Sequence, residues 1–183
     1  MEIITLGYLA LVSGGVSSGK SLYAENFLSE RALKSGGEKI YIATLKYNNN
    51  DPEILSRIRK HQAMRANKNF ITLECEKDFA HEKILRGANI LLESLTNWLA
   101  NEFFNDTFIN AQEIFKKICR EIDYMYEISN NLVIVSDDIF CDGIIYDDLT
   151  EKFLKCLAQI ETYTAAKSDM AVKIISGRCV KFR

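Results

Sequence analysis

A chain of 183 residues, 48% of them hydrophobic, can bury the core of one domain without disulfides or metal ions, so we expect a single domain over residues 1–183. A net charge of -2 excludes the strongly basic surface that nucleic-acid binding needs, and no apolar stretch has the length of a membrane span. The five cysteines are scattered without a Cys-x-x-Cys pair, which argues against a zinc site and favours reduced thiols in the cytoplasm.

Short apolar segments alternate along the chain with longer segments of helical periodicity. In chain order the pattern predicts a strand at 8–13, a helix at 19–34, a strand at 39–44, a helix at 51–66, a strand at 70–74, a helix at 77–86, a strand at 88–94, a helix at 95–104, a helix at about 109–129, a strand at 131–136, a helix at 148–166 and a strand at 170–176. Strands that are apolar throughout and separated by helices are typical of a parallel sheet covered on both faces. We therefore predict an α/β fold of the doubly wound type.

Ligands of such sheets bind beyond the carboxyl ends of the strands. The loops that follow residues 13, 44, 74, 93 and 136 should therefore share one edge of the sheet. The unusual residues of the sequence lie in these loops, so this edge is the expected site.

The first of these loops has the sequence of a phosphate-binding loop. Its residues satisfy the pattern G-x-x-x-x-G-K-[ST] at every fixed position, after an apolar strand and at the start of a helix: Gly14, Gly15, Val16, Ser17, Ser18, Gly19, Lys20 and Ser21. The glycines let backbone N–H groups approach a phosphate, and the helix adds its positive N-terminal end. The lysine can reach the β- and γ-phosphates, and Ser21 can bind Mg²⁺. The alternative is a flexible Gly/Ser loop without a ligand.

A phosphate-binding loop needs an acidic partner for its metal ion. Glu93 ends one predicted strand, and Asp137 with Asp138 follows another. Either strand end can hold Mg²⁺ through water, and the alternative for both is an ordinary polar strand end.

A histidine between two arginines marks the predicted helix at 51–66. Glu53, Arg57, His61 and Arg65 recur every four residues and so form one stripe along the helix. Neighbouring positive charge favours the neutral, nucleophilic imidazole, and guanidinium groups bind phosphate oxygens. The stripe suits attack by a histidine nitrogen on a nucleotide phosphorus, but spacing alone favours a solvated, charged helix face with an incidental histidine. His81 has no such flanks and is interpreted as a surface residue.

Several segments together resemble the bifunctional adenosylcobinamide kinase / adenosylcobinamide-phosphate guanylyltransferase family of cobalamin biosynthesis. The matching segments run in family order over nearly the whole chain: "SGGVSSGKS", "YIAT", "PEILSRIRKHQAMR", "TLEC", "ILLESLTNWLANEFF", "VIVS" and "SGRCVKF". The phosphate-binding loop alone is shared by many families, whereas its combination with "YIAT" and the R-I-x-x-H segment is specific.

The resemblance implies two reactions and their substrates. One phosphorylates the aminopropanol hydroxyl of adenosylcobinamide, a corrinoid, with GTP or ATP. The other transfers GMP from GTP to that phosphate through a guanylyl-histidine and releases pyrophosphate. The resemblance also implies a RecA-like P-loop fold and a homo-oligomer, usually a trimer, while the expectation of Mg²⁺ comes from the loop motif itself.

The resemblance assigns roles to positions of this sequence. His61 falls on the guanylylated histidine. From the loop motif and the acidic strand end, Lys20 is expected to stabilise charge on the transferred phosphates, and Ser21 and Glu93 are the expected metal ligands. Outside the loop at 14–21, the segments that contact guanine nucleotide in the family correspond to Thr44, Leu45, Lys46, Gln62, Ala63, Met64, Arg65, Glu74 and Glu93.

The sequence departs from the family pattern mainly in its C-terminal half. Ser17 replaces an arginine in the loop, and extra asparagines precede Asp51. Family residues are replaced in the later segments by Asp137, Asp138, Phe140, Tyr146, Ala158, Glu161 and Thr162. Two alternative functions stay open for this reason. One is a generic P-loop kinase of small molecules, and the other is a GTP-binding homologue that lacks one activity.

Overall fold

The computed structural model describes residues 7–45, 56, 59, 67–76, 84, 86–104, 110–140 and 143–183. Its strands are β1 (Tyr8–Gly14), β2 (Lys39–Ala43), β3 (Phe70–Glu74), β4 (Asn89–Glu93), β5 (Asn131–Asp137), β6 (Met170–Ile175) and β7 (Arg178–Lys181). Its helices are α1 (Lys20–Ser35), α3 (Leu95–Phe103), α4 (Ala111–Ile128) and α5 (Asp148–Lys167). The helices predicted at 51–66 and 77–86 lie almost wholly outside the described residues.

The strands form one seven-stranded sheet in the order β3-β2-β4-β5-β1-β6-β7. All neighbouring pairs are parallel except β6 and β7, which are antiparallel. The predicted α/β fold with a mostly parallel sheet is therefore confirmed. The sequence reading missed β7, because it ended the last strand at 176. Ser176 and Gly177 both have positive φ values, as the two-residue turn of a tight hairpin requires, and they return the chain along β6.

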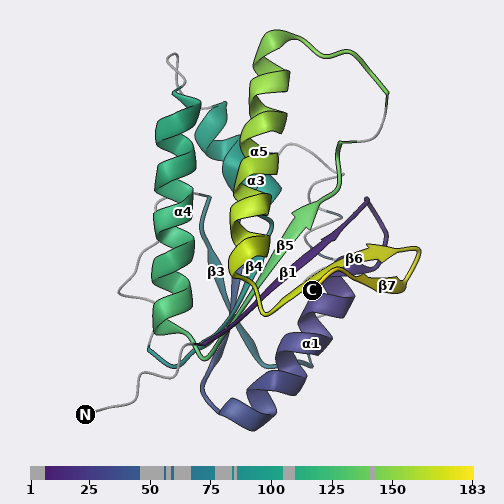
Figure 1. Cartoon of the computed structure of the whole chain (residues 1–183). Coiled ribbons are helices and arrows are strands. Elements are labelled where there is room, and N and C mark those ends of the chain that lie inside the picture. The colour runs from purple at the N-terminus through teal and green to yellow at the C-terminus, as the bar shows by residue number, and fades with distance from the viewer. Residues whose placement is uncertain are drawn as a thin grey trace.

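Helices cover both faces of this sheet (Figure 1). On one face α1 packs on alternate strand residues, which are mostly small: Ala10, Val12, Leu91, Val133 and Val135. On the other face α3, α4 and α5 pack on the residues between them: Leu9, Leu11, Ile90, Leu92, Leu132 and Ile134. This alternation follows from the two-residue period of a strand that is buried on both faces. Among the helices that the structure describes, none has both the length and the apolar character needed to cross a membrane.

The strand register brings the expected site residues to one edge of the sheet. Gly14 pairs with Asp137 at the ends of β1 and β5, and Ala43 pairs with both Glu74 and Glu93 at the ends of β2, β3 and β4. The predicted shared edge is therefore present in the described part of the chain.

Candidate active site

The loop between β1 and α1 has the compact backbone that its glycines permit. A Cβ atom on Gly14 would lie 2.6 Å from Ser18 Oγ and 2.7 Å from the carbonyl oxygen of Ile174, so only glycine fits there. Gly19, the N-cap of α1, has a φ of 94°, which L-residues rarely adopt. The chain consequently turns sharply and enters the helix with its first backbone N–H groups directed at the loop.

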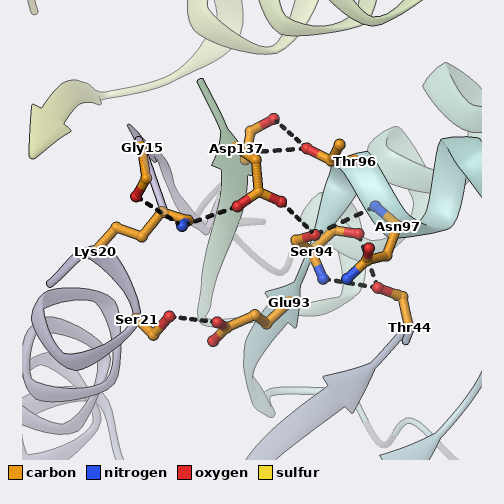
Figure 2. A network of polar contacts seen from close by, with 10 residues as sticks. Gly15, Lys20, Ser21, Thr44, Glu93, Ser94, Thr96, Asn97 and Asp137 are labelled. Carbon is orange, nitrogen blue, oxygen red and sulfur yellow. Dashed lines mark hydrogen bonds and ion pairs between the residues drawn. The ribbon is translucent and has the colours of Figure 1, made fainter. Parts of the chain in front are cut away.

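The side chain of Lys20 lies against this loop and is only 10% exposed. Its ammonium group donates to the carbonyl oxygen of Gly15 at 3.2 Å and forms an ion pair with Asp137 Oδ1 at 2.8 Å (Figure 2). A phosphate bound in the loop would compete with both oxygens for this cation. The lysine therefore already lies close to where a bound phosphate would need it.

Asp137 is fixed by the first turn of α3 as well as by Lys20. Its second oxygen, Oδ2, accepts a hydrogen bond from Ser94 Oγ at 3.2 Å, and its backbone N–H donates to Thr96 Oγ1 at 2.9 Å. Ser94 is also the N-cap of α3, where its hydroxyl accepts from the backbone N–H of Asn97. One helix start therefore orients the carboxylate that holds the loop lysine.

Ser21 and Glu93 form the second polar contact across the site. The Ser21 hydroxyl donates to Glu93 Oε1, and the other carboxylate oxygen is shielded from solvent (Figure 2). Burial raises the pKa of Glu93, while hydrogen bonds from Ser21 and Tyr41 and the charge of Lys20 act in the opposite direction. A hydroxyl beside a carboxylate is a pair of hard oxygen donors, the kind that Mg²⁺ prefers.

These two residues fit a magnesium site that is completed by substrate phosphates and water. Within the described ranges, no group of three or more His, Cys, Asp or Glu side chains is arranged to hold a metal ion. Mg²⁺ usually binds through one or two protein oxygens and the phosphates of its substrate, so a complete protein cage is not needed. The expected ligands Ser21 and Glu93 therefore lie together, as a phosphate-linked metal would require.

Thr44 and Ser94 tie the ends of β2 and β4 to each other. The Thr44 hydroxyl donates to the carbonyl oxygen of Ser94 at 2.8 Å and accepts from its backbone N–H at 2.7 Å. Asn101 of α3 donates to the carbonyl oxygens of Thr44 and Glu76 at 2.7 and 2.9 Å. Thr44 is fully buried, so its side chain supports this edge of the sheet rather than lining its surface.

The other predicted site residues divide into two groups. Leu45 follows β2 and is half-buried, and the exposed Glu74 ends β3 at the same edge. The remaining residues of the prediction lie outside the described part of the chain: Lys46, His61, Gln62, Ala63, Met64 and Arg65.

Comparison with known families decides which P-loop enzyme this is. The family model described as cobinamide kinase / cobinamide phosphate guanyltransferase matches residues 10–182. The chain belongs to this family. No curated protein matches it. The enzyme is therefore a transferase of cobalamin biosynthesis, with cobinamide kinase and cobinamide phosphate guanyltransferase activity, and its substrates are a corrinoid and nucleotides.

Helix α5 adds a half-buried acid, Glu161, to the site. In the sequence this residue stood out only as a departure from the family pattern. Glu161 accepts a hydrogen bond from Ser136, whose hydroxyl lies 3.3 Å from Thr96 Oγ1. Burial raises the pKa of Glu161, the hydrogen bond from Ser136 lowers it, and the charges of Asp138 and Asp137 raise it further. The sequence reading missed Ser94 and Thr96 altogether, although a serine directly before a predicted helix is a signal for an N-cap.

Proposed function

We propose that the enzyme carries out both family reactions at the edge formed by the loop at 14–21, Glu93 and Asp137. A nucleoside triphosphate, GTP or ATP, phosphorylates the aminopropanol hydroxyl of adenosylcobinamide. GTP then donates GMP to the new phosphate, and pyrophosphate is released. The observation that supports this proposal best is the placement of Lys20 beneath the loop, between Gly15 and Asp137.

The described residues supply the binding and charge stabilisation that both reactions need. Backbone N–H groups of the loop and the N-terminus of α1 bind the phosphates, and Lys20 neutralises charge that develops on them during transfer. Ser21 and Glu93 would hold Mg²⁺, which supplies charge neutralisation at the phosphates when bound. Glu93 thus links the metal to the sheet.

His61 is the proposed nucleophile of the guanylyl transfer, and it lies outside the described residues. A nitrogen of its ring would attack the α-phosphorus of GTP, so that a nitrogen–phosphorus bond forms and the bond to pyrophosphate breaks. A phosphate oxygen of the corrinoid would then attack the same phosphorus and release the histidine. The arginines at positions 57 and 65, four residues before and after His61 in the sequence, support this role because neighbouring positive charge favours the neutral ring and guanidinium groups bind phosphate.

Labelling with GTP that carries the label on its α-phosphate tests this proposal. We expect an acid-labile adduct in the wild type, none in His61→Ala, and an unchanged adduct in the control His81→Ala. An adduct that persists in His61→Ala would remove His61 from this role. A wild type that phosphorylates cobinamide without any adduct would favour the kinase reaction alone, and nucleotide binding without turnover would favour a homologue that has lost catalysis.

Three further properties belong to this proposal. Family resemblance favours a homotrimer, which light scattering after size-exclusion chromatography would test. A reducing, cytoplasmic compartment agrees with the absence of disulfides among the four described cysteines: Cys75, Cys119, Cys156 and Cys179. A single domain over residues 1–183 stays a prediction from length and composition.

A further inference from the structure

We propose that Asp137 is the catalytic residue that accepts the proton of the acceptor hydroxyl in the kinase reaction. The inference rests on the proposed binding of a triphosphate in the loop at 14–21. Asp137 is one of the positions at which this sequence departs from the family pattern, so the inference concerns a property of this chain.

The position of Asp137 places its carboxylate next to the phosphoryl group that would be transferred. It ends β5 and pairs in register with Gly14, the first glycine of the loop. Its Oδ1 atom lies 2.8 Å from Nζ of Lys20, the cation that reaches the β- and γ-phosphates in a loop of this kind. A γ-phosphate bound to that lysine would therefore share the ammonium group with the carboxylate and lie close to it.

The orientation of the carboxylate is fixed before any substrate binds. Ser94 Oγ donates to Oδ2, and the backbone N–H of Asp137 is held by Thr96, so two residues of one helix start determine where the group points (Figure 2). The side chain is 23% exposed, so an acceptor hydroxyl can approach it from solvent. A base that is oriented in advance and accessible meets the geometric requirement of general base catalysis.

The other carboxylates near the loop have polar partners other than the loop lysine. Glu93 accepts from Ser21, Asp138 forms an ion pair with Lys173 at 2.5 Å, and Glu161 accepts from Ser136. Asp137 differs because its cationic partner is the loop lysine itself. A phosphate bound to Lys20 would compete for this ammonium group and free Oδ1 of Asp137 to accept a hydrogen bond from the acceptor hydroxyl.

The proposed step is balanced as follows. The hydroxyl oxygen of the corrinoid forms a bond to the γ-phosphorus of the nucleoside triphosphate. The bond from that phosphorus to the β–γ bridging oxygen breaks, and its electron pair leaves with the nucleoside diphosphate. The O–H bond of the hydroxyl breaks, and its proton goes to a carboxylate oxygen of Asp137. After product release the proton passes to water and the ion pair with Lys20 re-forms.

The variant Asp137→Asn tests the proposal because its two expected effects have opposite signs. Loss of the ion pair releases Lys20, so binding of a non-hydrolysable ATP or GTP analogue, measured by calorimetry, should tighten. Loss of the base should lower kcat for phosphorylation of adenosylcobinamide by about 10²- to 10⁴-fold. The matched control Asp123→Asn breaks an ion pair of the same kind, with Lys167 on α5, and should change neither quantity.

Two further variants, Asp137→Glu and Asp137→Ser, keep the proposal testable if Asp137→Asn does not fold stably. The glutamate variant keeps a carboxylate and should retain a higher kcat than the asparagine and serine variants. Equal kcat in all variants and the wild type would overturn the proposal, as would a loss that appears in Asp138→Asn and not in Asp137→Asn. Failure of the proposed function would look different, because the wild type itself would then bind no triphosphate or phosphorylate no cobinamide.

Discussion

At the scale of single residues, the acids at this edge of the sheet differ in what surrounds them. Glu93 and Glu161 lie where burial raises the pKa of the carboxyl group, whereas Asp137 and Asp138 each face a lysine. Sequence patterns predicted that acids end β4 and β5, because a phosphate-binding loop needs them. They did not predict that Lys173 of β6 pairs with Asp138 or that Glu161 of α5 lies near both aspartates. Both residues come from segments far along the chain.

The raised pKa of Glu161 leads to a prediction about stability. The folded state holds the proton of this carboxyl group to a higher pH than the unfolded chain does, so its contribution to stability falls as pH rises through that interval. The charged groups that face it are Asp137 and Asp138 from β5 and Lys173 from β6. Glu161→Gln keeps an acceptor for the Ser136 hydroxyl and removes the ionisable carboxyl group from this half-buried position. We expect it to raise the free energy of unfolding at pH 8 by about 0.5 to 2 kcal/mol.

Urea unfolding at pH 8 and at pH 4 measures this effect, since the difference between variant and wild type should shrink at the lower pH. The control Glu151→Gln lies on the same helix, in an exposed pair with Lys155, and should change the free energy of unfolding by less than about 0.5 kcal/mol at either pH. A Glu161→Gln protein less stable than the wild type at pH 8 would show that the ionised carboxylate stabilises the fold.

At the scale of secondary-structure elements, local signals predicted most boundaries well. Asn110 and Asp147 cap α4 and α5 through their side chains, and the predicted helices begin within two residues of those caps. The central strands were recognisable because they are mostly apolar, which a buried parallel sheet requires. The edge strand β3 is largely exposed but was still predicted, whereas the missed strand β7 has only exposed residues and no apolar run.

The hairpin of β6 and β7 supports the phosphate-binding loop from outside. The backbone N–H of Gly177 donates to the carbonyl oxygen of Ser18 at 2.8 Å, and the hairpin lies beside the first turn of α1 (Figure 1). Gly177 has a φ of 77°, so Gly177→Ala strains this turn by about 1 to 2 kcal/mol. We expect this strain to shift the loop and weaken nucleotide binding about 3- to 10-fold, a change that titration calorimetry can measure.

Gly36→Ala is the matched control for this variant. Gly36 also has a positive φ and open space around its Cβ position, but it follows the far end of α1. It should lower thermal stability and leave nucleotide affinity unchanged. Equal loss of affinity in both variants would show that the hairpin acts only through overall stability.

At the scale of the whole molecule, the site draws its residues from segments far apart in the chain. The register places the ends of β1, β4 and β5 at one edge, so a ligand there contacts groups that separate when the chain unfolds. The sequence predicted this edge from the order of its strands and helices. It did not predict that α3 would orient Asp137 or that β7 would extend the sheet, because both depend on packing across the fold.

Binding at such a site stabilises the folded state by mass action. A nucleotide at a concentration of 100 times its Kd adds about 2.7 kcal/mol, which for a chain of this size is roughly a 5 to 10 °C rise in Tm. If Ser21 and Glu93 hold Mg²⁺ against the phosphates, part of that rise should require the metal and vanish with chelator. Ser21→Ala should therefore keep the rise seen with nucleotide alone and lose the increment that Mg²⁺ adds. Ser29→Ala, two turns further along α1, should keep both, and a full magnesium increment in Ser21→Ala would place the metal on other ligands.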